Sequence, residues 1–181
     1  GVMITHRNAY MNAVGTLVHI PMSCADRYLW TLPMFHANGW TFVWIVTAVG
    51  GTHVCLRKVD PVEAFGLIRD ERVSMLCAAP TVLIGLASCA ADQRGEVPAG
   101  VRVLTAGAPP AAATIQRVEG EFGWELTHVY GLTETAPFIT VCEPRPEHAE
   151  LSLEARSVVK ARQGVELITS GELDVVDDGG Q

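Results

Sequence analysis

The sequence predicts an α/β fold, in which a layered, mostly parallel sheet is flanked by helices and followed by a short β-rich C-terminal extension. Strand and helix signals alternate over residues 1–141, and the expected strands are apolar without alternating polar positions. Both features are typical of a parallel sheet that helices cover on both faces. The pattern breaks after Val141. We therefore expect an α/β subdomain at 1–141 and a second part at 142–181, made of a loop, a short helix and the start of a β subdomain.

Local signals place the elements along the chain. Thr5 is a good helix N-cap, and the residues from His6 to about His19 carry apolar side chains at helical spacing. Asp60 and Pro61 start a helix that runs to about Glu71. We expect further helices at 41–49, 81–91, 110–122 and 151–161, and strands at 28–32, 52–56, 74–78, 101–105, 124–129, 137–141 and 172–176. Because the helix at 41–49 is almost wholly apolar, we expect it to be buried.

The composition is that of a folded globular chain, with 49% hydrophobic and 18% charged residues. A net charge of −7 argues against a nucleic-acid partner. The longest apolar run, Trp40 to Val49, is too short to span a membrane, and the first residues lack the pattern of a signal peptide. No two cysteines are closely spaced, so we expect buried free thiols in a reducing cytoplasm. The five are Cys24, Cys55, Cys77, Cys89 and Cys142.

Three loops that follow expected strands carry the candidate functional residues. They contain His36, Gly107 and Tyr130. Ligands of parallel sheets bind at the carboxyl ends of the strands, so these loops should meet at one edge of the sheet. The sequence therefore predicts one shared site.

The third loop, Tyr130-Gly131-Leu132-Thr133-Glu134-Thr135, combines the groups that a nucleotide needs. Gly131 lets the backbone approach a ligand closely. An aromatic face can stack on a base, a hydroxyl can bond a phosphate oxygen, and a carboxylate can hold Mg²⁺ that is itself bound to phosphate. The alternative is an ordinary turn with a capping Thr–Glu pair.

This six-residue motif resembles the adenylate-binding motif of the acyl-adenylate-forming superfamily, which includes acyl-CoA synthetases, adenylation domains and luciferases. Leu32 to Trp40 (LPMFHANGW) and Thr105 to Pro110 (TAGAPP) match two further motifs at the family's spacing. Gly1 to Asn8 resembles the segment that follows the family's phosphate-binding loop. The likeness covers roughly residues 1–165. The Phe-His-Ala-Asn-Gly-Trp segment is most similar to the corresponding segment of fatty acyl-CoA synthetases.

The resemblance implies a role for each matching residue. Thr133 would bind the α-phosphate, Glu134 would be both catalytic and the metal ligand for Mg²⁺, and His36 would lie near the acyl carboxylate. His36 and Trp40 would form the substrate site, with Trp40 as the gate of an acyl tunnel. The cofactor-binding residues would be Gly107, Ala108, Pro109, His128, Val129, Tyr130 and Gly131. The alternatives are a core histidine at position 36, simple packing for Trp40 and a plain strand–helix connection at Gly107.

The family's phosphate loop, its ribose-binding Asp and its small C-terminal domain have no counterpart in these residues. We therefore expect an internal part of the large N-terminal domain of an acyl-CoA synthetase, inactive in isolation. The implied activity converts a fatty or other carboxylic acid and ATP to acyl-AMP and pyrophosphate, and then to acyl-CoA, with ATP, Mg²⁺ and coenzyme A as ligands. The alternatives are a fatty acyl-AMP ligase, an aryl-CoA ligase or a non-catalytic nucleotide-binding module. Exposed apolar surface favours self-association, for example as a homodimer.

Overall fold

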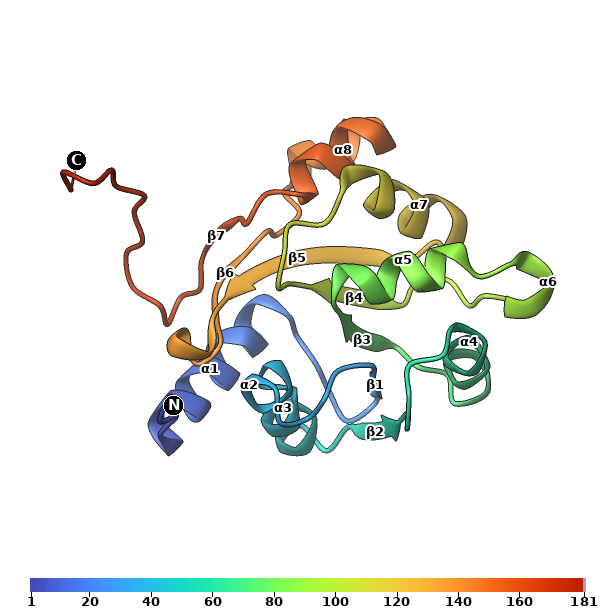
Figure 1. The fold of residues 1–181 in the computed structure, drawn as a ribbon, viewed down its shortest axis with the longest axis horizontal. Coiled ribbons are helices and arrows are strands. Elements are labelled where there is room, and N and C mark those ends of the chain that lie inside the picture. The colour runs from blue at the N-terminus through green and yellow to red at the C-terminus, as the bar shows by residue number, and fades with distance from the viewer. Residues whose placement is uncertain (181) are drawn as a thin grey trace.

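The computed structural model describes residues 1–180 and shows a seven-stranded sheet in the order β2-β1-β3-β4-β5-β6-β7 (Figure 1). The five strands from β2 to β5 are parallel, whereas β6 runs antiparallel to both β5 and β7. The strands are β1 (Arg27–Trp30), β2 (Thr52–Cys55), β3 (Met75–Ala78), β4 (Arg102–Thr105), β5 (Glu125–Gly131), β6 (Phe138–Val141) and β7 (Val165–Glu166). The layered, mostly parallel sheet is thus confirmed.

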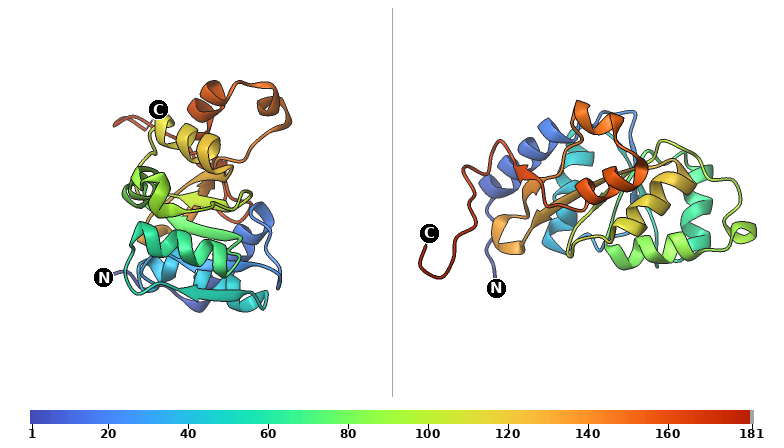
Figure 2. Two further views of the ribbon diagram at one scale, coloured as in Figure 1. Left: turned by 90° about the vertical axis from the view of Figure 1, so that its right-hand side faces the viewer. Right: turned by 90° about the horizontal axis from the view of Figure 1, so that it is seen from above.

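Helices cover both faces of this sheet (Figure 2). The helices are α1 (His6–His19), α2 (Ala37–Trp40), α3 (Phe42–Ala48), α4 (Pro61–Asp70), α5 (Pro80–Ser88), α6 (Ala91–Arg94), α7 (Ala112–Phe122) and α8 (Leu153–Lys160), with 3-10 turns η1 (Thr133–Thr135) and η2 (Pro146–Glu150). Tyr28 and Trp30 pack into a core with α1 and α3, and Leu29 between them packs into a second core with α4, α5 and α7. Neighbouring strand residues therefore fill opposite cores, as a doubly covered sheet requires.

Capping side chains start the two best-predicted helices. Thr5 Oγ1 accepts a hydrogen bond from the Asn8 amide at 3.1 Å, and Asn8 Oδ1 accepts one from the Thr5 amide at 3.1 Å. At α4, Asp60 Oδ1 accepts a hydrogen bond from the Glu63 amide at 3.0 Å, with Pro61 as the first helical residue. These bonds are local, so the sequence alone reveals them.

The packing of α1 on the sheet is not evident from its apolar spacing, because mainly small and polar residues are buried. Its buried residues are Asn12, Ala13, Gly15 and Thr16, and Leu17 packs partly buried against the core, whereas Tyr10, Met11, Val14 and Val18 are exposed. Asn12 Nδ2 donates to the Phe138 carbonyl at 2.7 Å, so a buried amide joins α1 to β6 in addition to the core contacts of Ala13 and Leu17.

Three expectations are wrong. The helix α3 is not buried on all sides, because it packs on the sheet through one face only and leaves the Trp44 side chain 46% exposed. No strand forms at 172–176, where the residues are exposed and none of the described chain pairs with the outer side of β7. Cys24, in a turn, and Cys55, on the edge strand β2, are exposed, although all five cysteines are free thiols as expected.

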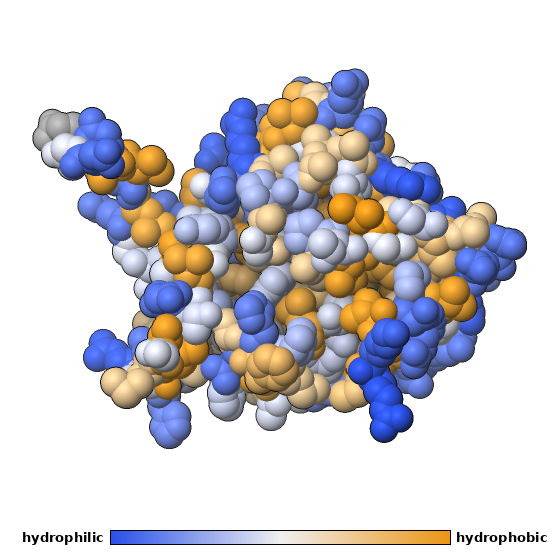
Figure 3. Space-filling model, in the orientation of Figure 1, coloured by the Kyte–Doolittle hydropathy of each residue, from blue (hydrophilic) through white to orange (hydrophobic). Residues whose placement is uncertain are grey.

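The surface is mixed in character. Figure 3 shows hydrophobic side chains interspersed with hydrophilic ones on one face, with the last described residues before position 181 extending away from the body. Among residues 1–180, no helix combines the length and the apolar character that crossing a membrane requires.

Candidate functional site

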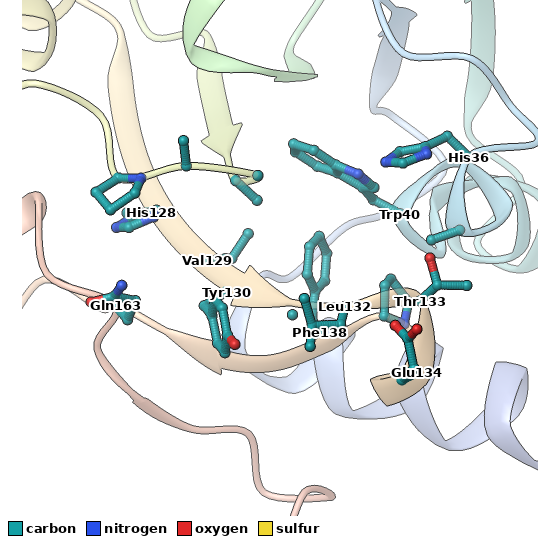
Figure 4. Close-up of a pocket in the computed structure, with 17 residues that line it drawn as sticks. His36, Trp40, His128, Val129, Tyr130, Leu132, Thr133, Glu134, Phe138 and Gln163 are labelled. Atoms are coloured by element: carbon teal, nitrogen blue, oxygen red, sulfur yellow. The ribbon is translucent and has the colours of Figure 1, made fainter. Parts of the chain in front are cut away.

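The three loops singled out in the sequence meet in one pocket of about 320 Å³ at the carboxyl ends of the parallel strands (Figure 4). All eleven candidate residues line it: His36, Trp40, Gly107, Ala108, Pro109, His128, Val129, Tyr130, Gly131, Thr133 and Glu134. The size is that of a small-molecule site. The shared location is therefore a property of the fold, whereas the role of each residue stays a prediction.

The first wall is a left-handed turn. Residues 37–41 all have positive φ, between 40° and 67°. Each non-glycine residue in this conformation costs about 1–2 kcal/mol, so tertiary contacts must hold the turn. A Cβ on Gly39 would collide with the Trp30 ring, and the Trp40 ring meets the Phe138 ring edge-on at 5.9 Å between centroids. The turn leaves His36 exposed at the pocket rather than buried in the core. The Trp40 ring is part of the core and also lines the pocket.

The second wall follows β4. Gly107 has a φ of 92°, which reverses the chain beside the pocket, and an added Cβ would have no neighbour within 4 Å. Residues 107–109 are exposed to the cavity, and α7 begins at Ala112, two residues later than the sequence predicts, with no side-chain cap. Small residues and a chain reversal leave room for a flat ring at this wall.

The third wall is the turn after β5. Thr135 Oγ1 accepts a hydrogen bond from the Leu132 amide at 2.7 Å and is also bonded to the Leu132 and Pro137 carbonyls, so its hydroxyl closes the turn. A Cβ on Gly131 would collide with the Pro137 carbonyl. Neither Thr133 Oγ1 nor the Glu134 carboxylate bonds to another side chain within residues 1–180, and both are exposed. The turn therefore presents one free hydroxyl and one free carboxylate.

His128 is held from outside the pocket. Its Nδ1 lies 3.1 Å from the Ala161 carbonyl oxygen and 2.9 Å from that of Arg162, at the end of α8. Burial lowers the pKa of His128 below its usual value, and the two carbonyl bonds oppose that effect only in part. The imidazole is therefore neutral at physiological pH, with the proton on Nδ1.

Sequence reasoning missed some of the lining. Gln163 reaches the pocket from the segment after α8, near His128 and Tyr130 (Figure 4), and Phe138 forms its apolar floor. Phe138 was predictable, since it follows the motif directly on an apolar strand. Nothing in the local pattern marks Gln163, because its position depends on how α8 packs.

The side chains that line the pocket suit a metal ion that is already bound to the phosphates of a nucleotide. Glu134 is the one acidic side chain lining the pocket within residues 1–180, and no group of three or more His, Cys, Asp or Glu there could hold a metal ion. Mg²⁺ bound to nucleotide phosphates needs only one or two protein carboxylates, so Glu134 is sufficient for such an ion. The pocket thus offers a wall of small residues, a hydroxyl and a carboxylate.

The fold and the pocket together define an α/β protein with a small-molecule-sized pocket at the strand ends. Residues 1–181 match the family of AMP-binding enzymes, and the chain belongs to that family. It is 45% identical over 181 residues to 4-hydroxybutyrate–CoA ligase 2 of Metallosphaera sedula, covering 100% of this chain and 33% of the relative. It is 38% identical over 175 residues to a peroxisomal trans-cinnamate:CoA ligase of Petunia hybrida, covering 97% of this chain and 30% of the relative.

A solved structure agrees with this assignment. The chain superposes on the O-succinylbenzoate coenzyme A synthetase of Bacillus subtilis, determined in complex with ATP and a magnesium ion, with a TM-score of 0.80 and 26% identity. The match covers 100% of this chain and 35% of that enzyme. The chain therefore spans about a third of the length of the relatives it matches.

Proposed function

We propose that the protein activates a carboxylic acid with ATP and transfers the acyl group to coenzyme A. The observation that carries this proposal is the pocket, which brings the Gly107 wall, the Tyr130 ring, a free hydroxyl and a free carboxylate together from three loops. The named relatives are acid–CoA ligases, which supports the same reaction class.

The chain's own residues serve the first step as follows. The base lies between the Gly107–Pro109 wall and Tyr130, which sets the α-phosphate toward Thr133 and Glu134. An oxygen of the substrate carboxylate forms a bond to the α-phosphorus while the bond to the pyrophosphate oxygen breaks, and negative charge grows on the phosphate oxygens. Thr133 Oγ1, which has no hydrogen bond to any other part of residues 1–180, donates to one of them. Glu134 would hold Mg²⁺, and the ion would neutralise phosphate charge when bound.

His36 and Trp40 define the acyl end. His36 is exposed on the left-handed turn across the pocket, where it orients the substrate carboxylate. Trp40 and Phe138 form an apolar wall that suits an acid with a hydrocarbon tail, for which we propose a fatty acid. An aromatic acid is the second candidate, since one relative is a trans-cinnamate ligase.

We further propose that this chain alone does not catalyse the formation of acyl-AMP. No Lys or Arg lines the pocket within the described chain, so no cationic side chain there stabilises the departing pyrophosphate. ATP–pyrophosphate exchange driven by a fatty acid would contradict this. The free thiols support a reducing compartment, for which we propose the cytoplasm.

The test is a titration of the chain with a non-hydrolysable acyl-AMP analogue and, separately, with ATP in the presence and absence of Mg²⁺. Tyr130→Ala should weaken binding of the analogue about tenfold, because stacking of a side chain on one base contributes about 1–3 kcal/mol. Glu134→Ala should leave analogue binding nearly unchanged and abolish the gain that Mg²⁺ gives to ATP.

Glu125→Ala is the matched control, since Glu125 is an exposed carboxylate at the opposite end of the same strand β5. It should bind like the unmodified chain in both titrations. A chain that unfolds cooperatively but binds neither ligand would contradict the assignment of this pocket to nucleotides.

A further inference from the structure

Three consecutive hydrogen bonds join β1, β2 and α3 beside the left-handed turn at residues 37–41. Trp30 Nε1 donates to His53 Nδ1 at 2.9 Å. His53 Nε2 lies 3.2 Å from Thr47 Oγ1, which itself donates to the Val43 carbonyl at 2.8 Å. An indole N–H only donates, so His53 Nδ1 has no proton, and a neutral imidazole then has its proton on Nε2 and donates it to Thr47. The three bonds therefore run in one direction, from Trp30 to Val43.

The two residues at the ends of this hydrogen-bond chain are the ones that confine Gly39. A Cβ added to Gly39 would lie 2.5 and 2.8 Å from two carbons of the Trp30 ring and 3.2 Å from Val43 Cγ1. Those ring carbons, Cζ3 and Cη2, belong to the six-membered ring, whereas Nε1 belongs to the five-membered ring. The indole is thus bound to His53 through one ring and meets the turn with the other. The hydrogen bonds therefore hold both side chains against which Gly39 packs.

The position of Gly39 affects both residues at the acyl end of the pocket. The His36 carbonyl accepts hydrogen bonds from the Gly39 amide at 2.9 Å and from the Trp40 amide at 3.3 Å, so the three residues are joined through their backbone. His36 and Trp40 both line the pocket (Figure 4). Residues 37–41 all have positive φ, a conformation that side chains disfavour, so the turn depends on its neighbours to keep its shape.

We propose that His53 is a positioning residue for the acyl end of the pocket, because it holds the Trp30 ring that supports the turn carrying His36 and Trp40. The inference rests on the proposed function, in which these two residues meet the acyl group. His53 itself is exposed on the edge strand β2 and lies outside the pocket lining. Trp30 is only 3% exposed. Without an acceptor its N–H would be left unpaired or would pull the ring toward another partner, and the turn would lose one of its two supports.

The first experiment compares two probes on the chain, the sulfamate of adenosine and its N-dodecanoyl derivative, which differ only in the acyl group. His53→Leu removes the acceptor, leaves no cavity at this exposed position, and should weaken the dodecanoyl probe about tenfold while changing the affinity for the other probe less than about twofold. His53→Asn should restore the affinity of the unmodified chain, because Asn Oδ1, like His Nδ1, is bonded to Cγ and accepts a hydrogen bond.

His148→Leu is the matched control. His148 lies in the turn η2, outside the pocket lining, so this variant should bind both probes like the unmodified chain. A role in general stability would weaken both probes alike. Equal weakening of the two probes by His53→Leu, or no weakening of either, would therefore overturn the inference.

The second experiment needs no ligand. Nitrogen-15 NMR should show His53 unprotonated at Nδ1 and protonated at Nε2, and the Trp30 indole proton should exchange slowly with water. Slow exchange should be lost in His53→Leu and kept in His53→Asn. A proton on Nδ1 of the neutral ring, or a Trp30 proton that is indifferent to both substitutions, would overturn the inference while leaving nucleotide binding intact. Failure of both probes to bind the unmodified chain would overturn the proposed function, and the inference with it.

Discussion

Thr133 and Thr135 show how two identical side chains in one turn differ in what they can do. The Thr135 hydroxyl is bonded to Leu132 and Pro137 and closes the turn, whereas the Thr133 hydroxyl has no partner within residues 1–180. The sequence shows two hydroxyls beside a carboxylate and cannot rank them. The structure assigns Thr135 to holding the turn and leaves Thr133 available to a ligand.

Gly131 provides a prediction at the same scale. Gly131→Ala should destabilise the fold by about 3 kcal/mol, because the new methyl group would collide with the Pro137 carbonyl and force the turn apart. Urea unfolding measures the change. The matched control is Gly66→Ala within α4, where an added Cβ meets only the flexible tip of Arg69, at 3.9 Å. That change should stabilise the chain by about 0.5–1 kcal/mol, and equal effects of the two substitutions would refute the argument.

At the scale of the element, the sequence predicted features that depend on neighbouring residues and missed features that depend on distant ones. The helices α1 and α4 begin where their caps indicate, since Thr5 and Asp60 bond to amides three residues away. The left-handed turn at α2 was not predictable, because its φ values depend on Trp30 and Phe138, which are distant in sequence. The buried bond from Asn12 of α1 to Phe138 of β6 likewise joins residues that are distant in sequence.

The missing strand at 172–176 provides a prediction for the C-terminal segment. A chain ending at Ser170 should unfold with a free energy within about 0.5 kcal/mol of the full chain, because residues 171–180 are exposed. Ending the chain at Gly164 instead removes β7 and the buried Leu167, which should cost about 2–4 kcal/mol. Denaturant titration of both chains checks this. A large loss from the shorter deletion would show that 171–180 packs on the fold.

At the scale of the whole molecule, the alternation of strands and helices was enough to predict that three distant loops share one edge. All eleven candidate residues line a single pocket because parallel strands end on the same side. That reasoning could not find Gln163, which lines the pocket, or the Ala161 and Arg162 carbonyls, which hold His128 from outside it, because all three come from the segment after α8. The topology of a parallel sheet therefore locates the edge at which the loops meet. It does not reveal that the segment after α8 contributes to the site.

The outward face of α1 leads to the last prediction, which concerns association. Tyr10, Met11, Val14 and Val18 are exposed on this helix, Tyr10 by 67%, and such a patch favours contact with another apolar surface. We expect the chain to self-associate through it as its concentration rises, in the simplest case as a homodimer. The double substitution Val14→Glu and Val18→Lys keeps the net charge and places an ion pair at helical spacing. It should weaken association at least about tenfold, since it replaces roughly two buried apolar side chains. The melting temperature of the monomer should be unchanged, because both side chains are exposed in it.

Sedimentation velocity over a range of concentrations measures the association constant directly. Ile84→Thr on α5 is the control, because Ile84 is exposed but lies across the sheet from α1. It should associate like the unmodified chain. If the α1 face drives association, only the α1 variant stays monomeric at concentrations where the other two chains do not. A monomer at every concentration in all three chains would remove the argument that this apolar face needs a partner, and equal weakening by Ile84→Thr would place the contact on the opposite side of the sheet.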